Sequence, residues 1–214
     1  MIFSEVLYPA LKETLYMVSV STIFAVLAGF IPAILLVITD ERGLTPNMAV
    51  HKVLDVVVNL LRSFPFIILM IAIFPFTKLL VGKTIGTTAA IVPLTIAAAP
   101  FAARIIESAL KEVDPGVIEA AKSFGASNIQ IIFKVMLKEA MPSIVLGITL
   151  TVISVVGYSA MAGAVGGGGL GDVAIKYGYY RFKTDVMIYT VIVLIVLVQV
   201  LQSVGNIVYK KFTK

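Results

Sequence analysis

The sequence predicts an all-α integral membrane protein with five transmembrane helices. Of its 214 residues, 59% are hydrophobic, and the mean hydropathy of +1.04 lies far above that of soluble domains, which are about half apolar. The apolar residues also gather into runs without Asp, Glu, Lys or Arg that are long enough for a helix to cross the roughly 30 Å hydrocarbon core of a bilayer. We therefore expect a single transmembrane domain over residues 1–214.

The first expected span covers residues 14–39, which hold no charged residue. A cleaved secretory signal is disfavoured because the uncharged run is too long, Lys12 and Glu13 precede it, and no small-residue cleavage site follows before the charged turn. Pro32 is tolerated within a membrane helix whose neighbours satisfy the freed carbonyl, and it is expected to bend the helix. We expect this span to be retained.

Four further spans are expected roughly over residues 54–77, 84–110, 140–164 and 186–209. None has an acidic or basic residue near its middle, whereas carriers coupled to protons or sodium usually need such groups. Arg62 and Arg104 lie near span ends, where long basic side chains can extend to the interface. Any transport is therefore expected to draw its energy from outside this chain.

The distribution of basic residues predicts the orientation. Five spans place the termini on opposite sides. If the N-terminus is outside, the inside segments carry eleven Lys and Arg and the outside segments carry six. Because cytoplasmic loops are enriched in Lys and Arg, we expect the N-terminus outside, the C-terminus in the cytoplasm and the loop over residues 114–139 in the cytoplasm.

Composition excludes several kinds of chemistry. The chain has no cysteine and one histidine, His51, whereas metal, haem and thiol sites need several such ligands together. We expect no metal, no cofactor and no catalytic residue, and we place His51 on the surface of a cytoplasmic helix. The net charge of +5 does not indicate nucleic acid, because in a membrane protein the informative quantity is which loops are basic.

The loop between the third and fourth spans predicts two short amphipathic helices. Asp114 and Pro115 form a helix start, because the carboxylate accepts from free backbone N–H groups and proline suits the first helical position. Gly125 supplies a left-handed residue at the helix end, and Ser127 with Gln130 forms a capping box that starts the second helix. The first helix carries an apolar stripe of Val117, Ala120, Ala121 and Phe124, and the second carries one of Ile129, Ile132, Phe133, Met136, Leu137 and Ala140. The pair is expected to be a docking surface, and the alternative is a helix pair lying on the membrane.

Two glycine-containing segments have both a structural and a functional interpretation. Gly166, Gly168 and Gly171 formally satisfy G-x-G-x-x-G, but a dinucleotide site needs a preceding strand and a following helix, so we expect an irregular turn with close backbone packing. Residues 157–163 are mostly small, which favours close helix contact in lipid. The functional alternative is that Tyr158, Ser159 and Met161 project into a translocation pathway, with Met161 as a flexible apolar gate.

The organisation of the spans predicts that any pathway lies between two chains. No span repeats at a fixed period and no inverted halves are visible, in contrast to many secondary transporters. A five-span bundle is also too small to enclose a route for a solute the size of an amino acid. We therefore expect a two-fold homodimer with the pathway on its axis.

The same loop resembles the EAA loop of the membrane subunits of ABC importers. The pattern E-A-A, three residues, glycine, nine residues, I-x-L-P is met by Glu119-Ala120-Ala121 and Gly125, with Val135 for the isoleucine and Lys138 in place of proline. The resemblance implies that this loop is cytoplasmic and that its first helix, the coupling helix, sits in a groove of a separate ATPase. It implies that Glu119, Ala120, Ala121, Lys122 and Gly125 are the coupling residues.

Longer segments are similar to the permease family of bacterial methionine ABC importers. They are residues 62–70 (RSFPFIILM), 157–172 (GYSAMAGAVGGGGLGD) and 177–185 (YGYYRFKTD). The resemblance implies a homodimeric permease in the bacterial inner membrane that moves methionine by alternating access. The implied partners are an ATPase dimer, which binds the ATP, and an external methionine-binding lipoprotein.

Three other functions remain open at this point. Within importers, the solute could be another small molecule such as a polar amino acid. A membrane-embedded enzyme would need paired carboxylates, histidines or metal ligands at bilayer depth, which the expected spans lack. A passive channel would conduct without nucleotide.

Overall fold

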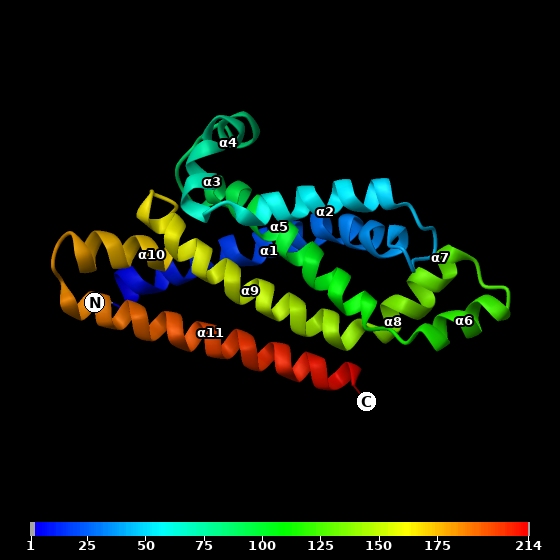
Figure 1. Ribbon diagram of the computed structural model, residues 1–214. Helices are drawn as coiled ribbons and strands as arrows, with labels where there is room; N and C mark the ends of the chain where they lie inside the picture. Colours follow the sequence, from blue (N-terminus) through cyan, green and yellow to red (C-terminus); the bar gives the residue numbers. More distant parts are fainter. Residues whose placement is uncertain (1–2, 214) are drawn as a thin grey trace.

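The computed structural model describes residues 3–213, and every regular element in that range is helical (Figure 1). The predicted all-α class is therefore confirmed for this part of the chain. The elements are the π-helix η1 (Phe3–Leu7), α1 (Tyr8–Thr39), α2 (Met48–Ser63), α3 (Phe66–Ala72), α4 (Phe74–Val81), α5 (Thr87–Lys111), α6 (Pro115–Ser123), α7 (Asn128–Gln130), the π-helix η2 (Ile131–Met136), α8 (Leu137–Glu139), α9 (Met141–Ala164), α10 (Gly169–Val173), the π-helix η3 (Ala174–Tyr179) and α11 (Thr184–Phe212).

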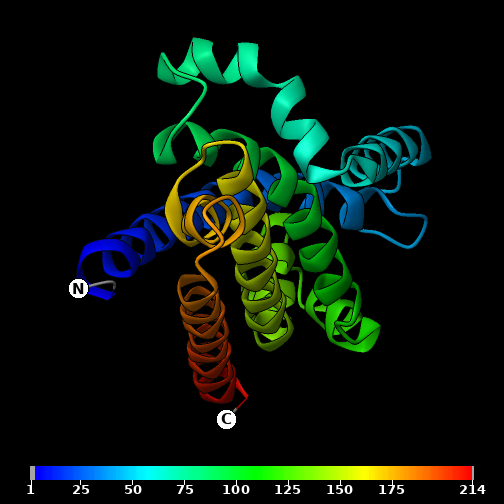
Figure 2. The ribbon, with the colours of Figure 1, turned by 90° about the vertical axis from the view of Figure 1, so that its left-hand side faces the viewer.

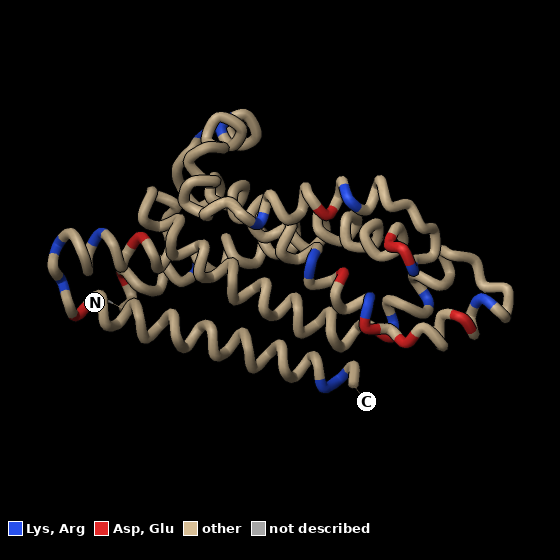
Figure 3. Tube along the Cα trace, in the orientation of Figure 1, with Lys and Arg blue, Asp and Glu red and all other residues tan. Residues whose placement is uncertain are grey.

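Four helical segments are long and apolar enough to cross a membrane: Phe3–Thr39, Thr87–Lys111, Met141–Tyr179 and Thr184–Phe212. A fifth candidate exists if α2 and α3 count as one span, although they are bent by 100°. Lys, Arg, Asp and Glu lie mainly toward the two ends of the long helices, as Figure 3 shows. This distribution is the one expected of a bundle that spans a bilayer.

The segment expected as one span over residues 54–77 is three helices in the structure. Asn47 caps the start of α2 by accepting from the Val50 N–H, so the helix begins well before residue 54. Pro65 then ends it, because the residue before a proline is pushed out of the helical region, and Phe64 has φ −73° and ψ 127°. A second break at Ile73 precedes Pro75 in the first turn of α4. The second expected span is therefore not one continuous helix in the structure.

Helices α1 and α5 pack backbone against backbone at the centre of the bundle. A Cβ added to Gly29 of α1 would lie 2.5 Å from the Ala99 carbonyl oxygen and 2.8 Å from the Ala103 nitrogen. Small residues allow this approach, which is the usual basis of tight helix contact in lipid. In Figures 1 and 2, α9 lies beside this pair and α11 runs along α9 at the lower edge of both views. Four residues of α11 are buried, Val186, Thr190, Leu197 and Gly205.

The glycine-rich segment after α9 forms the expected irregular turn. Gly166, Gly168 and Gly169 have φ of 86°, 82° and 75°, a region that only glycine enters readily. The Gly169 N–H donates to Glu13 Oε2 at 2.7 Å and the Leu170 N–H donates to Thr14 Oγ1 at 2.9 Å. The segment that precedes this turn is α9 rather than a strand, so the structural interpretation of the G-x-G-x-x-G match is confirmed.

This turn gives a stability prediction. Gly169→Ala places a Cβ 2.6 Å from Thr14 Oγ1 at a φ of +75°, and such strain costs about 1–3 kcal/mol. We expect a lower thermal unfolding midpoint in detergent. Gly157→Ala is the matched control, since its Cβ would meet no heavy atom within 4 Å and alanine favours a helix by up to about 1 kcal/mol over glycine. Equal midpoints for both variants would contradict this account of the turn.

Candidate functional site

Helix α6 and the turn after it form at the end of the bundle remote from the N-terminus (Figure 1). Asp114 caps α6, its Oδ1 accepting from the Gly116 N–H at 2.6 Å, and Gly125 ends the turn with φ +79°. Ser127 N–H donates to Gln130 Oε1 at 2.9 Å while Gln130 N–H donates to Ser127 Oγ at 3.3 Å. The predicted helix, glycine turn and capping box are confirmed.

One face of α6 holds it to the bundle. Ile118 and Ala121 pack against a buried cluster that includes Val113, Ile131 and Met136. No residue of α6 is itself buried. The helix is therefore anchored along one side and open along the other.

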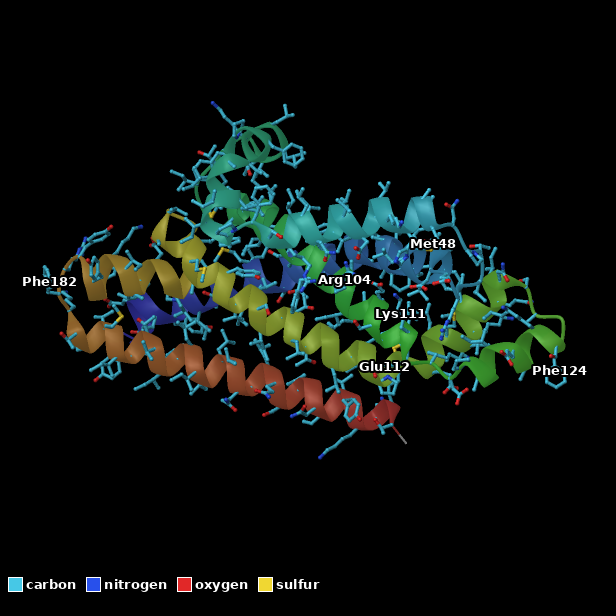
Figure 4. The ribbon with its side chains drawn as sticks, viewed as in Figure 1. Met48, Arg104, Lys111, Glu112, Phe124 and Phe182 are labelled. Carbon is cyan, nitrogen blue, oxygen red and sulfur yellow. The ribbon has the colours of Figure 1, made fainter. Side chains whose placement is uncertain are left out.

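The open face carries exposed apolar side chains. Val117 is 40% exposed, Phe124 92% and Ile129 70%, and Ala120 is exposed between them. Phe124 projects from the tip of this end of the molecule in Figure 4. Exposed apolar patches of this kind mark interaction sites. The expected stripe is thus divided, because Ala121 packs inward while Val117, Ala120 and Phe124 face outward.

The two charged residues of the predicted coupling set line a cavity. Glu119 and Lys122 border a space of about 610 Å³ between α6 and the turn after α1, with Asp40, Arg42 and Lys111 on its other walls. Neither Glu119 nor Lys122 forms an ion pair within residues 3–213. These side chains are therefore available to a partner.

A polar network that the sequence analysis missed is centred on Arg104 of α5, labelled in Figure 4. Its Nη2 donates to Asp55 Oδ1 at 2.7 Å and to Asn59 Oδ1 at 2.9 Å, and its Nη1 donates to Glu107 Oε2 at 2.8 Å. Arg104 was expected to extend to the membrane interface. In the structure the guanidinium is held between α2 and its own helix by Asp55, Asn59 and Glu107.

The network continues to the end of α1. Lys111 Nζ lies 3.0 Å from Glu107 Oε1 and 2.7 Å from Asp40 Oδ2. The Lys111 ammonium lowers the pKa of the Asp40 carboxyl below its usual value by hydrogen bonding to it. His51 Nδ1 lies 2.9 Å from the Leu36 carbonyl oxygen and Nε2 lies 4.0 Å from Asp40 Oδ2.

We call this network the charged seam. It consists of Asp40, His51, Asp55, Asn59, Arg104, Glu107 and Lys111. His51 was expected on the surface and instead is partly buried within the seam. One signal was available, since His51, Asp55 and Asn59 recur every four residues and so share one face of a helix. Within residues 3–213 no group of His, Cys, Asp and Glu is arranged to hold a metal ion.

The three candidate pathway residues on α9 have different surroundings. Tyr158 is partly buried and its ring stacks on Phe66 of α3 at 5.0 Å between centroids. Ser159 is 2% exposed and donates to the Val156 carbonyl at 2.8 Å, so it faces the interior of this chain. Met161 is 46% exposed. Of the three, Met161 is the one available to a pathway outside this chain.

The chain matches known proteins over nearly its whole length. The family model described as "Binding-protein-dependent transport system inner membrane component" matches residues 25–214. The "Probable D-methionine transport system permease protein MetI" of Vibrio cholerae is 52% identical over 208 residues, covering 97% of this chain and 92% of that protein. The "Methionine import system permease protein MetP" of Bacillus subtilis is 46% identical, covering 94% and 91%. A solved chain of the MetNI methionine ABC transporter in an inward-facing conformation superposes with a TM-score of 0.95 at 43% identity, covering 97% of this chain and 96% of that one.

Proposed function

Because the chain belongs to the family of inner membrane components of binding-protein-dependent transport systems, we propose that it is the permease subunit of an ATP-driven importer of methionine. The family membership that the sequence indicated is confirmed. The chain is accordingly a transport subunit of the inner membrane rather than an enzyme, and ATP hydrolysis belongs to a partner ATPase. The rival classes of membrane enzyme and passive channel are set aside by the family.

The observation that carries this proposal is the open face of α6. α6 exposes Val117, Ala120 and Phe124 while its other side is anchored to the bundle. Such a helix suits a groove on another protein, because small residues permit close approach and the burial of apolar side chains is energetically favourable. Glu119 and Lys122 lie beside it and form no ion pair within residues 3–213. We place the ATPase here, with the nucleotide bound entirely by that partner.

The solute is methionine rather than a polar amino acid. The similar proteins of Vibrio cholerae and Bacillus subtilis are named for D-methionine and methionine transport. Since recognition in binding-protein-dependent systems begins outside the membrane, a methionine-binding lipoprotein on the outer side delivers the solute to this chain.

Transport requires a second copy of the chain. The bundle is small, and the arm of α3 and α4 exposes large apolar side chains, with Leu79 at 81% and Leu80 at 60% exposure. We propose a two-fold homodimer with the pathway on its axis and Met161 facing it. The N-terminus lies outside and the C-terminus in the cytoplasm, so that α6 faces the ATPase. Closure of the ATPase dimer draws the two α6 helices together and switches the pathway between inward-facing and outward-facing states.

The docking role of α6 is tested best at Ala120. Ala121 packs against the chain's own core, so a charge there would disturb folding, whereas Ala120 is exposed. We expect Ala120→Glu to reduce ATPase association more than tenfold, because an unpaired charge buried at an interface costs more than about 1.4 kcal/mol. Co-purification with the ATPase and ATP-dependent methionine uptake into vesicles measure this. Ala49→Glu, also at an exposed alanine but on α2, is the control and should retain both properties; normal association of Ala120→Glu would refute the docking role.

The gate role of Met161 has a separate readout. Met161→Ala removes a flexible apolar side chain from the proposed pathway, so methionine should leak across vesicles without ATP while the ATPase still associates. Leu150→Ala, at another exposed apolar residue of α9, is the control. Unchanged leak, uptake and selectivity in Met161→Ala would remove this residue from the pathway.

A further inference from the structure

Helix α2 is amphipathic, but its apolar face points outward and its polar face points toward the bundle, the reverse of a surface helix in a soluble protein. Its apolar residues face outward, with Val53 63%, Val56 60% and Leu60 55% exposed. Three of its polar residues, His51, Asp55 and Asn59, face the bundle, where the charged seam binds them to α1 and α5. One residue of α2, Val58, is buried. The position of α2 therefore depends on directional polar contacts more than on apolar packing.

The seam extends from α2 to the neighbourhood of α6. At one end Asp55 and Asn59 bind Arg104, and at the other Lys111 binds Asp40. Lys111 is the last residue of α5, three residues before the Asp114 cap of α6. Asp40 and Lys111 also form one wall of the cavity whose opposite wall carries Glu119 and Lys122 of α6. A displacement of α6 therefore acts first on the Lys111 end of the seam.

Arg104 is not fully satisfied in this arrangement. Its two terminal nitrogens are bound, but its Nε is buried and has no hydrogen-bond partner. A buried donor without an acceptor is costly, so the guanidinium is bound by fewer acceptors than it could use.

We propose that Arg104 is a positioning residue of the transport cycle, fixing α2 to α5 through the charged seam so that a displacement of α6 is passed on to α2. This proposal rests on the proposed function, because the displacement of α6 is driven by the partner ATPase. Ion pairs removed from water contribute little net stability compared with apolar packing, but they fix geometry. The seam thus fixes the position of α2 relative to α5 and contributes little to the free energy of folding.

The experiment uses the full chain, alone in detergent and assembled with its ATPase and binding protein in liposomes. The test variants are Arg104→Gln and Asp55→Asn, the latter keeping the side-chain shape while removing one charge. Arg62→Gln is the control, because Arg62 lies on the same helix α2 and forms no ion pair within residues 3–213. Amide hydrogen exchange over residues 48–63 reports the attachment of α2, and exchange over α9 and α11 reports the fold.

We expect Arg104→Gln to speed exchange in α2 by about tenfold, the factor that corresponds to 1.4 kcal/mol, with α9 and α11 unchanged. In liposomes it should reduce methionine uptake per ATP hydrolysed by about the same factor while the ATPase still associates. Asp55→Asn should give a smaller change in the same direction, since Asn59 and Glu107 still bind Arg104, and Arg62→Gln should give none.

Two outcomes would overturn the proposal. Faster exchange in α2 with normal methionine uptake per ATP would show that the seam holds α2 but has no role in transport. Unchanged exchange in both test variants would show that the seam does not hold α2. Failure of the unaltered chain to bind any ATPase would instead count against the proposed function. The exchange measurement on the chain alone would still report whether the seam holds α2.

Discussion

The close contact between α1 and α5 is the constraint on which the rest of the structure depends. At Gly29 the two backbones approach so closely that no Cβ fits between Gly29 and the Ala99 carbonyl, and α5 continues its small-residue face with Ala98, Ala102 and Ala109, all buried. In lipid no hydrophobic effect drives helices together, so packing of this kind has to supply the association. Because α5 is fixed along its length, both Arg104 and the α6 helix that follows it have defined positions.

The charged residues lie either where the free-energy cost of a charge in the bilayer is lowest or where they have partners. Most lie at the ends of the long helices (Figure 3). Arg104 and Glu107 of the charged seam lie further in and are paired, with the Glu107 side chain 4% exposed and bound to both Arg104 and Lys111. The free-energy cost of removing charges from water is offset only when the ion pairs have good geometry. The inward polar face of α2 and its outward apolar face follow from the same requirement.

Much of this could be predicted from the sequence where local chemistry decides the outcome. The α6 start at Asp114, the turn at Gly125 and the capping box of Ser127 and Gln130 each depend on residues within a few positions of one another. Pro65 could also have predicted the break in the second expected span. It lies, however, within a run of uncharged residues, and such a run favours the interpretation as one continuous span. The charged seam could not be placed, because Asp55 and Arg104 are 49 residues apart and the sequence alone does not show which helix faces meet. The burial of Ser159, in contrast to the exposure of neighbouring Met161, depends on the same long-range packing.

Docking of an ATPase on α6 requires that the end of the molecule carrying α6 faces the cytoplasm. The chain has no cysteine, so single cysteines at Ser123 in α6 and at Phe182, which is 86% exposed near the opposite end (Figure 4), can be labelled with a membrane-impermeant maleimide. We predict that Phe182→Cys is labelled in intact cells while Ser123→Cys is labelled in inverted vesicles alone. Labelling of Ser123→Cys from outside intact cells would contradict the orientation, and with it the docking of an ATPase on α6.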